Sequence, residues 1–103
     1  MTEPSAVADL FGEEPFRWGF RGDPHLWREM RERFAAVPRP DTVEELVSLI
    51  EAAFRELTGY PISQREPFWM ERYDHGGMSS GMISPDFWRD SAIPLLSQRY
   101  AEG

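Results

Sequence analysis

The amino-acid sequence predicts a small α+β domain, in which a sheet of two or three strands is covered by three helices. Two short segments rich in aromatic residues, at 15–21 and 67–74, have the composition of strands. Three longer segments carry apolar residues at helical spacing and begin with capping signals. The 103 residues are enough for one domain, which we expect to span residues 15–103.

The first strand is predicted at residues 15–21, because the run Phe-Arg-Trp-Gly-Phe-Arg alternates aromatic residues with arginine. Such alternation puts the two residue types on opposite faces, as in a half-buried strand. The next segment, 24–37, is predicted to be a helix, with Asp23 as its N-cap and Pro24 in its first turn. Its apolar stripe consists of Leu26, Trp27, Met30, Phe34 and Val37.

The second helix is predicted at residues 42–58 and has the clearest local signals. Thr42 and Glu45 form a capping box, in which each side chain satisfies a backbone N–H of the first turn. Gly59 supplies the expected left-handed C-cap. Three glutamates that point away from the apolar stripe form a predicted acidic face for a basic partner: Glu44, Glu51 and Glu56.

The second half of the chain predicts a strand, a glycine-rich loop and a helix. The strand is expected at 67–74, and a third short strand at 81–83 would form a hairpin with it across the polar stretch Asp74–Gly81. Whether the strands at 15–21 and 67–74 run parallel or antiparallel stays open. Ser84 and Pro85 predict the start of a helix at 85–100, which Pro94 should kink or split.

Residues 1–14 contain four acidic residues and no basic one, so most of this segment is predicted to be a mobile tail. Leu10 and Phe11 are apolar exceptions that could dock on the core of the domain or on a partner. The start of the chain shows no signal-peptide pattern, no run approaches the ~20 apolar residues of a membrane span, and cysteine is absent. A cytoplasmic protein is therefore expected.

All eleven basic residues are arginine, and the formal net charge is −7. The arginine bias is typical of a GC-rich bacterial genome, although arginine also suits protein interfaces. Net negative charge disfavours nucleic-acid binding, which relies on neutralising phosphate groups. With two histidines and no cysteine, neither a zinc site nor any other cofactor site is predicted.

Within the stretch Asp74–Gly81, residues 77–81 match the G-x-S-x-G pattern of a nucleophile elbow. The chain is too small for that fold, however, and both histidines precede Ser79. No catalytic residue is therefore assigned. The favoured function is protein binding. The protein would be an accessory or inhibitory protein, similar to an immunity protein or an antitoxin, or a subunit of a complex, or it would associate with itself. The alternative is a small-molecule-binding, anion-binding or catalytic domain that uses the Asp74–Gly81 loop with Arg17 and Arg21. A concave site and a shifted pKa of His75 would support it. Its residues would be Arg17, Trp18, Arg21, Tyr73, Asp74, His75, Gly76, Gly77, Ser79 and Ser80.

Overall fold

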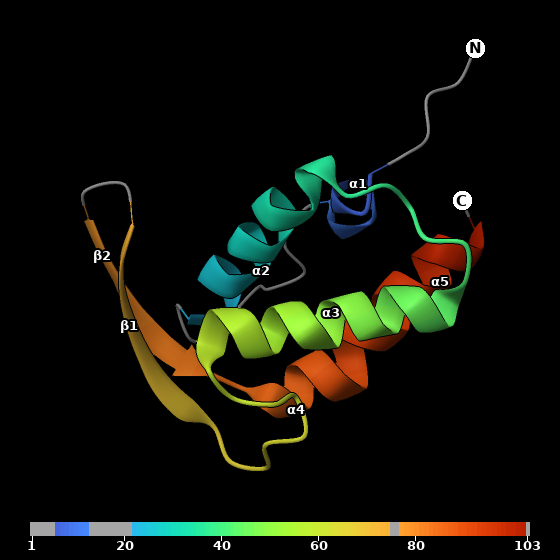
Figure 1. The fold of residues 1–103 in the computed structure, drawn as a ribbon. Coiled ribbons are helices and arrows are strands. Elements are labelled where there is room, and N and C mark those ends of the chain that lie inside the picture. The colour runs from blue at the N-terminus through green and yellow to red at the C-terminus, as the bar shows by residue number, and fades with distance from the viewer. Residues whose placement is uncertain (1–5, 13–21, 75–76, 103) are drawn as a thin grey trace.

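The computed structural model describes residues 6–12, 22–74 and 77–102, and it confirms the α+β class (Figure 1). The strand predicted at 15–21 lies outside the described residues. The described elements are helix α1 (Ala8–Phe11), helix α2 (Gly22–Arg33), the 3-10 turn η1 (Phe34–Ala36), helix α3 (Val43–Thr58), strands β1 (Phe68–Asp74) and β2 (Gly77–Ile83), helix α4 (Pro85–Phe87), the π-helical segment η2 (Trp88–Ala92) and helix α5 (Ile93–Glu102).

Helix α3 begins and ends where its sequence predicts, but of the two capping-box hydrogen bonds the described residues form only the one that Thr42 accepts. The Thr42 side chain accepts a 3.2 Å hydrogen bond from the backbone N–H of Glu45. At the other end Gly59 adopts φ 82° and ψ 1°, and its N–H donates to the carbonyl of Arg55 at 2.8 Å. A left-handed residue at this position satisfies a carbonyl that the helix itself leaves unpaired. Local chemistry therefore fixes both ends of the helix that carries the candidate site.

The sheet is a two-stranded antiparallel ribbon, whose register runs from Phe68 opposite Ile83 to Asp74 opposite Gly77. Strand β1 agrees with the prediction at 67–74. Strand β2 begins at Gly77, so the short strand expected at 81–83 is longer than predicted, and most of the supposed glycine-rich loop is strand. Pairing with β1 satisfies the backbone groups of this segment, which outweighs the low strand propensity of its glycines.

The predicted helix at 85–100 is present, but it is interrupted. In η2 the N–H of Ile93 donates to the carbonyl of Trp88, five residues earlier. Pro94 has no N–H to donate to Asp90, four residues earlier, so the ordinary ladder is broken just ahead of the proline. The interruption predicted at Pro94 is therefore present as the π-helical turn η2, which comes just before the proline.

Residues 6–12 pack into the core, so the prediction of a mobile tail does not hold for them. Val7 and Phe11 are fully buried and Leu10 nearly so, because their spacing gives α1 one apolar side. The N–H of Val7 also donates to the carbonyl of Val37 at 2.8 Å. Of the two alternatives for Leu10 and Phe11, docking on the domain's own core is the one observed.

One hydrophobic core joins these elements. Helix α3 packs against α2 and α5, and the ribbon lies at one end of the helical layer, where β2 contacts α2 (Figure 1). The largest fully buried side chains are Trp27, Trp88, Phe11, Phe54, Leu26, Met30, Leu46, Ile50, Ile83 and Leu96. This packing turns one side of α3 inward and leaves the other side exposed.

Candidate functional site

The exposed side of α3 carries two of the three glutamates of the predicted acidic face. Glu44 and Glu51 are seven residues apart, almost two full turns, so they lie in one line along the helix. Glu56 follows Glu51 by five residues and therefore points elsewhere. It forms an ion pair with Arg33 at the end of α2. The predicted face is thus divided, because packing of α2 beside α3 gives Glu56 a partner.

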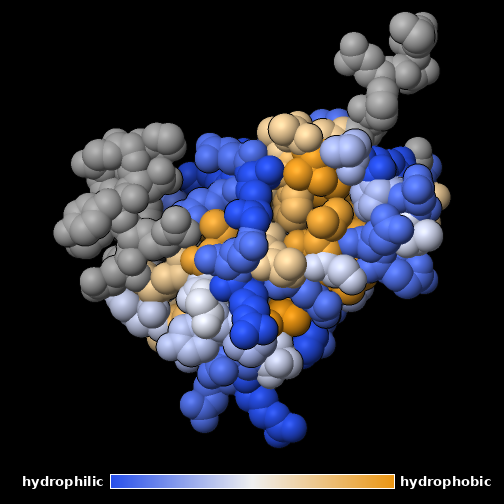
Figure 2. Space-filling view, in the orientation of Figure 1, coloured by the Kyte–Doolittle hydropathy of each residue, from blue (hydrophilic) through white to orange (hydrophobic). Residues whose placement is uncertain are grey.

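A surface hollow of about 410 Å³ lies beside the first two turns of α3. Its lining is mostly apolar and comes from Glu44, Glu45, Ser48 and Leu49. Leu49 is partly buried and packs against the core, whereas the other three residues are exposed. Figure 2 shows apolar surface between α2 and α3, bordered by strongly hydrophilic side chains. Of the four lining residues, only Glu44 belongs to the predicted acidic face.

The carboxylates at this hollow form no ion pair with a residue that the structure describes. Within the part of the chain that the structure describes, Glu44, Glu45 and Glu51 form no ion pair, in contrast to Glu56. Glu44 and Glu45 stand in the first turn, where the helix dipole stabilises negative charge without neutralising it. The hollow is therefore an apolar depression beside carboxylates that remain available to an external cation.

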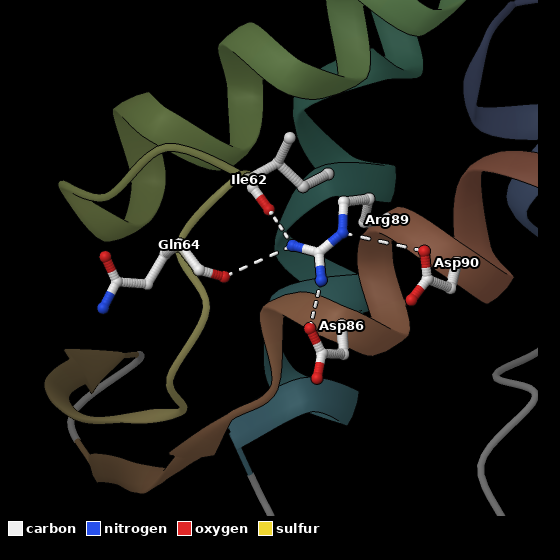
Figure 3. Close-up of polar contacts among 5 residues, drawn as sticks. All are labelled: Ile62, Gln64, Asp86, Arg89 and Asp90. Carbon is white, nitrogen blue, oxygen red and sulfur yellow. Dashed lines mark hydrogen bonds and ion pairs between the residues drawn. The ribbon is translucent and has the colours of Figure 1, made fainter.

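Arg89 lies beside a second hollow, of about 530 Å³, lined by Ser63, Arg65, Asp86 and Arg89. Its guanidinium donates to the carbonyls of Ile62 at 3.0 Å and Gln64 at 3.3 Å, and it also bonds the Asp86 carboxylate (Figure 3). Its Nε lies 3.6 Å from an Asp90 oxygen. Because the protein itself occupies these donors, Arg89 fastens the loop before β1 to α4 and η2.

Asp23 is a buried carboxylate, only 5 % exposed. The prediction of an N-cap is wrong, because α2 begins at Gly22 and the Asp23 oxygen accepts hydrogen bonds from the Ser84 N–H at 3.1 Å and the Trp88 indole N–H at 2.9 Å. Burial raises the pKa of Asp23, and these hydrogen bonds oppose the rise. The carboxylate joins two parts of the fold and is closed to a ligand.

The structure tests the predicted anion-binding residues only in part. Five of them lie outside the described residues: Arg17, Trp18, Arg21, His75 and Gly76. The backbone of the other five belongs to the hairpin, and their side chains lie outside the description: Tyr73, Asp74, Gly77, Ser79 and Ser80. Residues 77–81 are therefore paired strand, and binding of an anion or small molecule by these ten residues stays a prediction.

Two large aromatic side chains are exposed on the described surface. Trp69 on β1 is 59 % exposed, and Tyr60 is 42 % exposed and stacks on Phe68 with ring centroids 4.2 Å apart. Trp27, which belongs to the predicted apolar stripe of the helix at 24–37, is fully buried. Trp69 thus marks a second surface, on the outer face of the ribbon, opposite the side that packs on the core.

Comparisons of the chain with protein-family models, with curated proteins and with solved structures found no significant match. Within the described ranges, no helix is both long and apolar enough to cross a membrane. The same residues contain no group of three or more histidine, aspartate and glutamate side chains that could hold a metal ion. The physical chemistry of the surface is therefore the basis for a functional proposal.

Proposed function

We propose that this protein acts by binding another protein, as an accessory or inhibitory partner in the bacterial cytoplasm, through the exposed side of α3. The observation that carries the proposal is the apolar hollow at Leu49 beside the carboxylates of Glu44 and Glu45, which form no ion pair within the described ranges. Interfaces combine an apolar centre with a polar rim, and this surface offers both on one rigid helix.

The carboxylates of Glu44 and Glu45 favour a partner with a basic surface. Carboxylates without neighbouring cations attract a basic surface over several ångströms, which raises the association rate and disfavours acidic partners. The chain's net charge of −7 adds to this attraction. Binding to a basic protein should therefore weaken as salt screens the charges.

The test uses tagged protein to capture binding partners from a lysate of the native host, followed by mass spectrometry. We compare the wild type with the double variant Glu44→Gln/Glu45→Gln. The matched control is Glu32→Gln/Glu66→Gln, which removes two exposed carboxylates on other parts of the molecule and changes the net charge equally.

The proposal predicts a stoichiometric partner that the wild type and the control retain and that the α3 variant loses, with retention falling as salt rises. Equal retention by all three proteins would remove this side of α3 from the interface. Melting curves of each variant establish that it is folded, since Glu44 and Glu45 also stabilise the first turn by about 0.3–1 kcal/mol each.

A further inference from the structure

We infer that the hollow at Leu49 receives an apolar side chain from a cationic amphipathic helix of the partner. This inference rests on the proposed function and specifies the partner's chemistry. The hollow measures about 410 Å³ and is a shallow depression open to solvent rather than an enclosed cavity. An aliphatic side chain therefore has room to lie in it and to cover its apolar lining.

The floor of the hollow is fixed in place. Leu49 packs against the core cluster, and the buried residues Leu46 and Ile50 lie three residues before it and one residue after it on the same helix. A rigid apolar floor loses little side-chain entropy when a partner covers it, so an entering side chain gains the benefit of removing apolar surface from water. Ser48 also lines the hollow, and its side chain is exposed and small.

The spacing of charge and apolar surface fits a helix. Glu45 and Leu49 are four residues apart and lie on the same side of α3, about 6 Å apart along its axis. A partner helix that carries an apolar residue and a lysine or arginine one turn apart matches the spacing between Leu49 and Glu45. Its apolar residue would enter the hollow while its cation reaches Glu45 or Glu44.

A purely apolar partner fits this surface poorly. Covering Glu44 and Glu45 without supplying a cation would take two carboxylates out of water, which costs more than the apolar contact gains. An acidic partner would be repelled. Charge and shape together favour one occupant, an amphipathic helix with basic residues beside its apolar stripe.

The test measures binding of a fluorescent synthetic peptide by anisotropy. The probe is an amphipathic leucine–lysine helix of about 18 residues, long enough to form a helix readily. The control peptide has the same composition in scrambled order, so that its charge is unchanged but its apolar stripe is lost. The protein is used as the full chain, at low and at moderate salt.

Two variants address the hollow itself. Leu49→Gln makes its floor polar, and Leu95→Gln is the matched control at a partly buried leucine of α5. Ser48→Tyr is a second variant, at an exposed position, that fills the hollow without disturbing the core. We expect the amphipathic peptide to bind about tenfold more tightly than the scrambled one, and both hollow variants to remove most of that difference.

Equal binding of the two peptides, or an unchanged preference in both Leu49→Gln and Ser48→Tyr, would overturn the inference. The two proposals fail in different ways. If the protein captured from lysate depends on Glu44 and Glu45 but is retained fully by both hollow variants, the partner binds α3 by charge alone and only this inference falls. If capture does not depend on the glutamates, the proposed function falls.

Discussion

The indole N–H of Trp88 donates a 2.9 Å hydrogen bond to the buried carboxylate of Asp23, which lies 65 residues earlier in the chain. The bond ties the first turn of α2 to the π-helical segment η2. Trp88 also contacts the rings of Trp27 and Phe54, with centroids 5.8 Å and 6.1 Å away. The hydrogen bond between Trp88 and Asp23 therefore lies inside the aromatic centre of the core. Protonation of the Asp23 carboxylate should change the free energy of unfolding.

Replacing Asp23 with asparagine should remove a pH dependence of folding. Burial raises the pKa of Asp23 above its ordinary value of 3.8, so between these two values the folded chain holds more protons than the unfolded chain. The free energy of unfolding should then decrease as pH rises through this interval. Asp23→Asn keeps an oxygen acceptor for Ser84 and Trp88 without the buried charge, so its stability should stay level there.

Urea unfolding of the wild type and Asp23→Asn between pH 3 and pH 8 measures this difference, and Asp41→Asn is the control at an exposed aspartate. At neutral pH the Asp23→Asn protein should be at least as stable as the wild type. A constant loss of stability at every pH in Asp23→Asn would show that burial of the charge is not the determining factor.

Alanine should be tolerated less well at Gly12 than at Gly59. Gly12 ends α1 with φ 56° and ψ −144°, a conformation almost restricted to glycine. Gly59 has the ordinary left-handed values, and an added Cβ would meet nothing within 4 Å. We expect a cost of about 1–3 kcal/mol for Gly12→Ala and about 1 kcal/mol for Gly59→Ala. Denaturant unfolding compares them, and a larger cost at Gly59 would contradict the geometry of the α1 terminus.

Arg99 should be necessary for docking of the N-terminal segment. Its guanidinium donates to the carbonyls of Leu10 at 2.8 Å and Phe11 at 2.7 Å, at the end of α1. Hydrogen bonds from a charged group contribute about 1.5–3 kcal/mol, so Arg99→Gln should lower stability by an amount in that range. Amide exchange of residues 7–11 should accelerate. The exposed Arg65→Gln is the control, and equal exchange in both variants would assign the docking of α1 to apolar packing alone.

The parts of the fold that sequence predicts well are those set by neighbouring residues. Thr42, Glu45 and Gly59 define the ends of α3 through contacts within a few positions of each other. The role of Asp23 cannot be predicted in this way, because Asp-Pro is an ordinary helix start. The groups that Asp23 actually binds, on Ser84 and Trp88, are distant in the chain. The length of β2 cannot be predicted in this way either, since pairing with β1 overrides the turn preference of glycine.

In the candidate site, too, features set by neighbouring residues are predicted and features set by tertiary packing are not. Helical spacing correctly places Glu44 and Glu51 on an exposed side of α3. It cannot reveal that Arg33 pairs with Glu56, because this depends on how α2 packs beside α3. The hollow at Leu49 is also missing from the prediction, because helical spacing shows which residues share a side of α3 and not where its surface is hollowed.

Hydrogen exchange of this protein, alone and with the partner captured from lysate, tests the proposed interface most directly. Binding through α3 predicts slower exchange in residues 44–52, with little change in the ribbon around Trp69. Slower exchange confined to β1 and β2 would contradict it and would assign recognition to the exposed tryptophan instead.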